Sequence, residues 1–163
     1  MTKAKPIPEG YHTITPYIAI KDAAKAIEFY QKAFGAKEME KCLSPDGKIM
    51  HAVIKIGNSM LMLSDEMPGS DCGISSPETL KATTSMLFIY VEDADAFFNK
   101  AVEAGATVKM PLSDVFWGDR YGQLLDPYGH SWSVSTHKVD MTKEEIAEAA
   151  EKFFSDPANQ CCQ

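Results

Sequence analysis

Hydrophobic and polar residues alternate in two segments of the chain, residues 13–20 and residues 85–91. This period of two predicts a strand in each segment, with one face buried and the other open. The aliphatic face consists of Ile14, Ile18 and Ile20 in the first strand and of Leu87, Ile89 and Val91 in the second. We expect a helix to cover each of these faces.

A helix is predicted directly after each strand, where the spacing of the apolar residues changes from two to about 3.6. Asp22 and Asp93 precede the two helices, and a carboxylate at this position accepts hydrogen bonds from the first free amides of a helix. Gly35 and Gly105 follow the helices, and glycine readily adopts the left-handed conformation that ends a helix. Both helices therefore have a predicted start and a predicted end.

Three more strands follow each helix. They are predicted at about residues 37–43, 48–56 and 59–65 in the first half and at about residues 107–114, 117–125 and 130–137 in the second. Residues 44–47 and 126–129 contain the proline and glycine of tight turns, and Gly57-Asn58 is a two-residue hairpin signal. The element order is therefore βαβββ, twice.

The two halves also match in sequence, at an offset of about 70 residues. Residues 20–27 correspond to residues 91–98, and residues 57–59 correspond to residues 129–131. Chance similarity between two amphipathic segments would not reproduce strand, aspartate, helix, glycine and final hairpin in one order. We therefore predict one domain over residues 1–163, with repeats at about residues 12–65 and 84–137 and a linker over residues 66–83.

A further helix is predicted at the C-terminal end of the chain. Thr142 and Glu145 have the spacing of a capping box, which places the helix at about residues 142–154. Its apolar side consists of Ile146, Ala149, Ala150, Phe153 and Phe154. We expect this side to pack on the domain, and a contact between two copies of the chain is the alternative.

The formal net charge of −7 and the absence of a Lys/Arg cluster argue against a nucleic-acid partner and against binding to an anionic membrane. No apolar run has the length of a signal peptide or of a membrane-spanning helix, so we expect a cytoplasmic protein. The four cysteines lack the spacing of a zinc site, which argues against structural zinc.

Three motifs carry a resemblance to a known family. The first helix contains Ala-Ile-Glu-Phe-Tyr at residues 26–30, and the second repeat contains Phe-Trp-Gly-Asp-Arg-Tyr-Gly at 116–122 and Asp-Pro-Tyr-Gly-His at 126–130. With two βαβββ units, the chain resembles the vicinal oxygen chelate (glyoxalase/bleomycin resistance/dioxygenase) superfamily, in its PhnB-like branch. The resemblance implies an α+β, glyoxalase-like fold in which the half-repeats form a cup-shaped mixed sheet. It also implies a homodimer that completes the cup.

In metal-dependent members of this superfamily the ion is held by His, Glu or Gln from the first and last strand of each half. The resemblance places these positions at Thr15, Met86, Leu61 and Ser133, or at Met62 if the first copy slips by one residue. None of these residues is a good ligand for a divalent ion. We therefore predict no metal and no cofactor, and we expect the histidines at strand ends and turns to stabilise the fold.

The strand faces opposite the helices would instead provide an apolar and aromatic cleft with a few polar groups. Residues predicted to contact a ligand there are Thr15, Tyr17, His51, Leu61, Met86, Phe88, Trp117, Asp119, Tyr121, Gln123 and Ser133, with Tyr90 on the same face. For any single one of these side chains, filling the core is an equally good interpretation. Trp132 is predicted to lie in the core.

Three hypotheses about function follow. The first is a metal-independent protein that binds a small apolar or aromatic molecule, for example to sequester a drug. The second is a glyoxalase-like lyase, isomerase or transferase with a non-standard site, for which His51, Asp119 and Tyr121 are the candidate catalytic residues and His51 near Asp119 would act as a base. The third is a structural or regulatory dimer without a ligand.

Overall fold

The computed structural model describes residues 4–67 and 73–156 and has an α+β fold, as predicted. The first repeat contains β1 (Tyr17–Ile20), α1 (Ala23–Phe34), β2 (Lys37–Leu43), β3 (Ile49–Ile56) and β4 (Ser59–Asp65). The second contains β5 (Met86–Tyr90), α3 (Ala94–Glu103), β6 (Thr107–Asp114), β7 (Asp119–Leu125) and β8 (Ser131–His137). Two further helices are α2 (Pro77–Leu80) and α4 (Lys143–Ser155).

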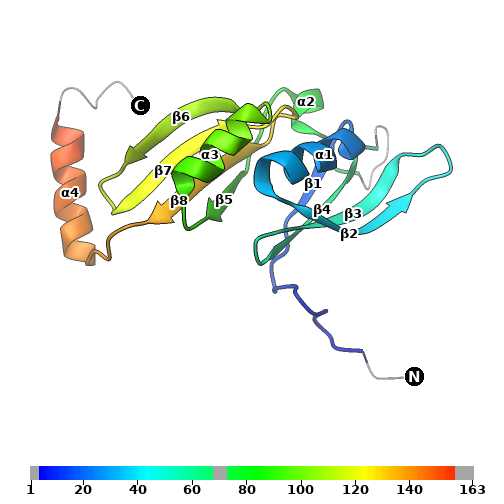
Figure 1. The fold of residues 1–163 in the computed structure, drawn as a ribbon, viewed down its shortest axis with the longest axis horizontal. Helices are drawn as coiled ribbons and strands as arrows, with labels where there is room; N and C mark the ends of the chain where they lie inside the picture. The colour runs from blue at the N-terminus through cyan, green and yellow to red at the C-terminus, as the bar shows by residue number, and fades with distance from the viewer. Residues whose placement is uncertain (1–3, 68–72, 157–163) are drawn as a thin grey trace.

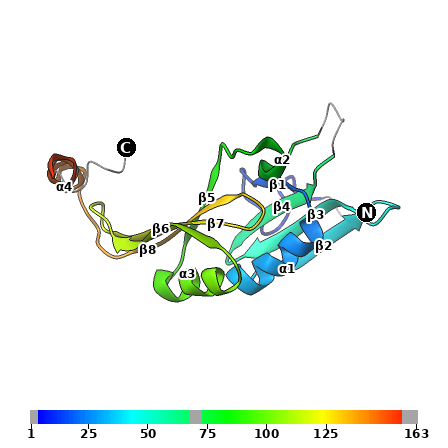
Figure 2. The same cartoon turned by 90° about the horizontal axis from the view of Figure 1, so that it is seen from above.

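The eight strands form two four-stranded sheets with the same topology (Figure 1). The strand order is β1-β4-β3-β2 in the first sheet and β5-β8-β7-β6 in the second. β1 pairs with β4 and β5 pairs with β8 in parallel, and all other neighbouring strands are antiparallel, so both sheets are mixed. Figure 2 shows α1 and α3 on the same side of the molecule, which leaves one face of each sheet without a helix.

Side-chain caps begin the helices α1 and α3, as predicted. Asp22 accepts a hydrogen bond from the amide of Lys25, and Asp93 accepts one from the amide of Ala96. The last strand of each half adds a second cap. Asp65 at the end of β4 accepts from the amide of Ala23, and Thr136 near the end of β8 accepts from the amide of Ala94. The two halves therefore start their helices in the same way with different residues.

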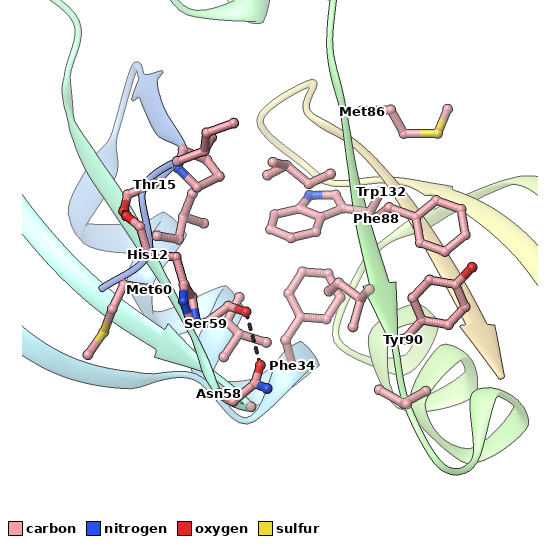
Figure 3. A pocket seen from close by; sticks show the side chains of 18 of the residues that line it. His12, Thr15, Phe34, Asn58, Ser59, Met60, Met86, Phe88, Tyr90 and Trp132 are labelled. Carbon is pink, nitrogen blue, oxygen red and sulfur yellow. Dashed lines mark hydrogen bonds between the residues drawn. The ribbon is translucent and has the colours of Figure 1, made fainter. Parts of the chain in front are cut away.

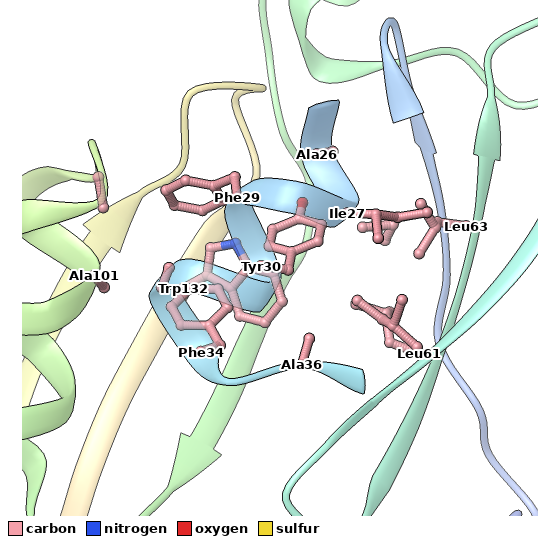
Figure 4. Close-up of a cluster of buried hydrophobic side chains, with 14 of the residues drawn as sticks. Ala26, Ile27, Phe29, Tyr30, Phe34, Ala36, Leu61, Leu63, Ala101 and Trp132 are labelled. Carbon is pink, nitrogen blue, oxygen red and sulfur yellow. The ribbon is translucent and has the colours of Figure 1, made fainter. Parts of the chain in front are cut away.

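The hydrophobic core lies between the helices and the sheets and continues from one half into the other (Figure 4). Phe34 at the end of α1 stacks on Phe97 of α3 at 5.5 Å and packs on Trp132 of β8 at 4.6 Å. Tyr30 also contacts Trp132, at 5.4 Å between ring centroids. Trp132 is 2% exposed, which confirms its predicted place in the core.

A buried carboxylate also joins the halves. Asp126, in the turn before β8, accepts hydrogen bonds from the Tyr30 hydroxyl at 2.7 Å and the Trp132 indole at 2.9 Å. The amides of Tyr128 and His130 donate to its other oxygen, so the carboxylate is satisfied although it is only 3% exposed. Burial and the nearby Asp126 charge raise the pKa of Tyr30, which keeps this hydroxyl a donor.

His130 makes a second link between the halves, because its ring lies 3.1 Å from the carbonyl oxygen of Ala19 in β1. The prediction that this histidine stabilises the fold is therefore confirmed. The Asp-Pro-Tyr-Gly-His motif consequently has a structural role in this chain: it fixes the second half against β1 and α1.

The start of the first strand differs from the prediction. We expected a strand from residue 13, but β1 begins at Tyr17, and Ile14 is 85% exposed instead of buried. The physical reason is Pro16, which has no amide hydrogen to continue the ladder and is followed by only four paired residues. Residues before Tyr17 form an arm that leads into the sheet.

Two helical features of the chain were not as expected. The linker contains the short helix α2, which was not predicted although its signals, the cap Ser76 and the first helical residue Pro77, are present in the sequence. The helix α4 has the predicted capping box and stands at one end of the molecule in Figure 1. Its apolar side packs on the domain only in part: the rings of Phe153 and Phe154 contact Phe116, but none of the residues of α4 is buried.

None of the helices in the described ranges is long and apolar enough to cross a membrane. Cys42 is a free, exposed cysteine on β2. Cys72, Cys161 and Cys162 lie outside the described residues.

Candidate functional site

The helix-free face of the second sheet brings together most of the predicted ligand-binding residues. Strand register places Phe88 beside Ser133 and Tyr90 beside Ser135 on the paired strands β5 and β8. Across the next pair, Tyr121 lies beside Ser135 and Gln123 beside Ser133. Because side chains alternate between the faces of a strand, all six residues project from the same face.

Aromatic rings cover this face. Phe88 contacts Tyr90 at 4.9 Å and Tyr121 at 5.7 Å, and Tyr121 contacts Trp117 at 5.4 Å. Tyr121 is only 7% exposed, whereas Phe88 and Tyr90 are 47% and 64% exposed. Large exposed rings are uncommon on a soluble surface unless something covers them in the working state.

Hydroxyl and amide groups lie between the rings. The Tyr121 hydroxyl is 3.0 Å from the Ser133 hydroxyl and accepts a hydrogen bond from the side-chain amide of Gln123 at 2.7 Å. Ser133 also contacts the sulfur of Met86. An apolar surface with a few convergent polar groups is typical of small-molecule binding sites.

A carboxylate lies at one end of the same face. Asp119 is 2% exposed and accepts hydrogen bonds from Ser135 at 2.9 Å and from Tyr90 at 3.3 Å. Its other oxygen is 2.7 Å from Nδ1 of His137. Burial alone would raise the pKa of Asp119, but the bonds from His137, Ser135, Tyr90 and Trp117 outweigh it and leave this pKa below its usual value.

His137 bridges two carboxylates. Its Nε2 is 3.0 Å from Asp140, while Nδ1 is bonded to Asp119. An imidazole donates from both nitrogens only when it is protonated, so this arrangement favours the cation. The hydrogen bonds to Asp119 and Asp140 accordingly raise the pKa of His137 above its ordinary value of 6.5.

The first half presents a smaller polar group on its helix-free face. His51 lies beside Tyr17, with Nδ1 3.4 Å from the tyrosine hydroxyl and the two rings 5.7 Å apart. A cavity of about 530 Å³ lies here between the N-terminal arm and the sheet, lined in part by Thr15, His51 and Met62. Thr15 belongs to the arm rather than to the strand, and its hydroxyl donates to the carbonyl oxygen of His12.

Leu61 does not lie on this face, which corrects the prediction. The hairpin at Gly57-Asn58 pairs Ile56 with Ser59, so Leu61 pairs with Ile54 and both enter the core, where Leu61 is 5% exposed. Its neighbour Met62 takes the helix-free position opposite Val53. A slip of one residue reverses the face of every side chain in a strand, which explains the error.

The suggested pairing of His51 with Asp119 is also wrong for the single chain. His51 is on β3 of the first sheet and contacts Tyr17, whereas Asp119 begins β7 of the second sheet and contacts His137. Ser135 and His137 were missing from the predicted ligand-binding residues. Strand alternation from Ser133 would have identified both, because they are two and four residues further along the same strand.

A groove with a volume of about 820 Å³ separates the two halves (Figure 3). The arm with the start of β4 lies on one side, β5 lies on the other, and Phe34 and Trp132 lie between them. One edge of β5 pairs with β8. Its other edge pairs with no strand of the described residues and faces this groove.

The residues at the family's metal positions do not fit a divalent ion. Ser133 is bonded to Tyr121 and contacts Met86, Leu61 is in the core, and Thr15 belongs to the arm. Within residues 4–67 and 73–156, no three His, Cys, Asp or Glu side chains are grouped as metal ligands. We therefore derive no chemistry through a metal.

Comparison with known proteins agrees with this architecture. The family model of the glyoxalase/bleomycin resistance protein/dioxygenase superfamily matches residues 11–134. The chain belongs to this superfamily. An uncharacterized protein of Mycobacterium tuberculosis is 42% identical over 138 residues, which are 83% of this chain and 81% of that protein. Protein YjdN of Escherichia coli is 27% identical over 80% of this chain and 99% of its own length.

Several solved structures have the same fold. TioX from Micromonospora sp. ML1 superposes with a TM-score of 0.62 at 26% identity, over 77% of this chain and 98% of TioX. A PhnB protein from Bacillus cereus gives 0.59 at 18% identity, over 77% of this chain and 99% of its own, and shows the fold alone. The resemblance to the superfamily is therefore confirmed, with a PhnB protein among the structural neighbours.

Proposed function

We propose that the protein binds an apolar or aromatic small molecule, without a metal, on the helix-free face of the second sheet, and that it sequesters this molecule. The observation that carries the proposal is the ring surface of Phe88 and Tyr90, which stays largely exposed beside the buried Tyr121. Stacking on such rings stabilises a flat ligand, and the hydroxyls of Tyr121 and Ser133 would orient its polar groups.

The donor set supports metal independence. FosX of Listeria monocytogenes, a structural neighbour at 15% identity with a TM-score of 0.57, was solved with Mn(II) and sulfate. Thr15, Met86 and Ser133 stand at the positions that the family resemblance assigns to metal ligands, and none of them offers a carboxylate or imidazole. Removing trace metal should therefore leave ligand binding unchanged.

We also propose that the binding unit is a homodimer. The open edge of β5 and the groove beside it, with Ile14 exposed on its other side, provide a surface that a second chain would cover. Sedimentation equilibrium should give about twice the 18.0 kDa mass of the chain. A single species with the monomer mass at working concentration would contradict the dimer.

Binding is best tested with a set of flat aromatic probes and the two tryptophans as reporters. Trp117 contacts Tyr121 on the proposed face, whereas Trp132 is buried in the core. A probe that binds on this face should quench Trp117, so the Trp117→Phe variant should lose the quenching while calorimetry still detects binding. Substituting Phe88→Ala should weaken binding by about 1 kcal/mol, the order of one aromatic contact.

Two outcomes would count against the proposal. Quenching that persists in Trp117→Phe would place the ligand near Trp132 in the groove between the halves. No binding of any aromatic probe at millimolar concentration would favour a structural or regulatory dimer instead.

A further inference from the structure

The buried carboxylate of Asp119 lies beside the exposed rings, and the basic side chain bonded to it is His137. The hydrogen bonds and charges acting on Asp119 come from Tyr90, Ser135, His137 and Trp117. The adjacent Arg120 projects to the other side of the sheet, where it binds Asp95 of α3 at 2.7 Å and Asp114 at 3.5 Å. Within the described part of the chain, the cation bonded to Asp119 is thus the imidazolium of His137, which can lose its proton.

We propose that Asp119 is the counter-ion for a positively charged group on the ligand, so that the site prefers flat aromatic cations to neutral or anionic aromatics. This inference rests on the proposed function, because it uses the same ring surface. The faces of Phe88, Tyr90, Trp117 and Tyr121 carry negative charge density, which attracts a cation as well as an apolar ring. A carboxylate among them would add a charge-assisted hydrogen bond.

The groups that cover Asp119 can give way to such a ligand. The bond from the Tyr90 hydroxyl, at 3.3 Å, is longer than those from Ser135 and His137, and Tyr90 is 64% exposed. The side chain of His137 is 51% exposed. A ligand could therefore reach the carboxylate from solvent by displacing Tyr90, without disturbing the buried hydrogen bond from Ser135.

Competition with His137 gives the inference a distinct signature. Protonated His137 places one positive charge between the carboxylates of Asp119 and Asp140, the acidic groups bonded to it among the described residues. Loss of the proton removes this charge, so the negative charge of Asp119 can pair with a ligand cation. The affinity for a permanent cation should therefore rise as pH increases through the raised pKa of His137.

Three probes with one ring skeleton separate charge from stacking: N-methylacridinium, acridine and acridine-9-carboxylate, titrated calorimetrically at a pH above the titration midpoint of the His137 ring, where this imidazole is neutral. We expect the cation to bind on the order of tenfold more tightly than acridine, and the anion more weakly than acridine. The matched variant Asp119→Asn keeps the shape and should lower the ratio of the Kd for acridine to the Kd for N-methylacridinium from about tenfold to about one.

A second variant keeps the test decisive if Asp119→Asn does not fold. His137→Asn removes the competing cation, so N-methylacridinium should bind this variant equally well below and above the pH at which His137 titrates, whereas the unchanged protein should bind it more weakly at the lower pH. Equal affinity of the unchanged protein for the cation and for acridine would overturn the charge preference but leave aromatic binding intact. Failure of every probe to bind would overturn both proposals.

Discussion

At the scale of single residues, the role of the buried Asp126 carboxylate can be tested directly by substitution. Its carboxylate accepts from Tyr30, Trp132 and two backbone amides. Asp126→Asn replaces one acceptor oxygen by a donor that faces other donors, so we expect the free energy of unfolding to fall by about 2–3 kcal/mol. Urea denaturation measures this loss.

Two control variants give reference values for the loss expected in Asp126→Asn. Tyr30→Phe removes one donor and should cost about 1 kcal/mol. Asp140→Asn, at a fully exposed carboxylate, should change the free energy of unfolding by less than about 0.5 kcal/mol. A cost for Asp126→Asn no larger than that of Asp140→Asn would show that the motif does not hold the halves together.

His137 provides the prediction about pH. Its pKa is raised by Asp119 and Asp140, so the protonated form stabilises the fold at pH values below the unfolded pKa of about 6.5. This contribution is lost as pH rises through the higher pKa of the folded state. The NMR titration of the His137 ring should therefore have a midpoint above 6.5.

The same titration has a matched comparison in the chain. Asp119→Asn should move the His137 midpoint back toward the ordinary value, because it removes the largest cause of the shift. A midpoint at or below 6.5 in the unchanged protein would contradict the proposed bridge between the two carboxylates.

Single-residue positions were the hardest part of the site to predict. Tyr121, Gln123 and Ser133 were found because they alternate along strands with clear polar and apolar faces. The bonds of Asp119 to Tyr90 and His137 join residues from three strands, and no spacing in the sequence expresses that contact. The face of Leu61 was predicted wrongly because it depends on the register of the hairpin between β3 and β4.

At the scale of elements, the packing of α3 on the second sheet depends on Gly122. A Cβ atom at this position would lie 2.8 Å from a ring carbon of Phe98 and 3.1 Å from the carbonyl oxygen of Met110. We expect Gly122→Ala to reduce the free energy of unfolding by about 1–3 kcal/mol, the cost of overpacking a core. Chemical denaturation measures it.

Shortening the obstructing ring tests the cause. Phe98→Leu combined with Gly122→Ala should recover part of the loss, because the closest contact is removed while the backbone contact with Met110 remains. A double variant in which the two losses simply add would mean that Gly122 is needed for another reason.

The C-terminal helix α4 gives a prediction of the opposite kind. None of its residues is buried, so we expect the free energy of unfolding of a chain that ends after Met141 to lie within about 0.5 kcal/mol of that of the full chain. Phe34→Ala, which empties a position between Phe97 and Trp132, should cost about 3–5 kcal/mol in the same assay. A comparable cost for the truncation would show that α4 packs on the protein in solution.

Elements were predicted well because their signals are local. Caps, turn residues and the change of period fixed α1, α3 and the hairpins to within a few residues, and the repeat fixed their order. Two element predictions needed correction. The strand β1 is shorter than predicted because Pro16 cannot donate to the ladder, although β4 continues past Met62 to Ser59. The apolar pattern of α4 shows which side can pack, but not how small a surface of the domain that side meets.

At the scale of the whole molecule, the two repeats share one core, yet their helix-free faces differ. The second carries exposed rings and a buried carboxylate, and the first carries His51 beside Tyr17 under the arm. Duplication and family resemblance made the fold predictable, while function depends on residues in which the copies have diverged. This asymmetry is why ligand binding is assigned to the second sheet.

The most direct test of metal-independent aromatic binding is one calorimetric titration, carried out twice with N-methylacridinium. The first uses protein dialysed against a chelator, and the second uses the same protein with added Mn²⁺. Because Thr15, Met86 and Ser133 offer no good ligand to a divalent ion, we expect the same Kd in both titrations. Binding that appears only after Mn²⁺ is added would contradict metal-independent binding and would indicate a metal-dependent site.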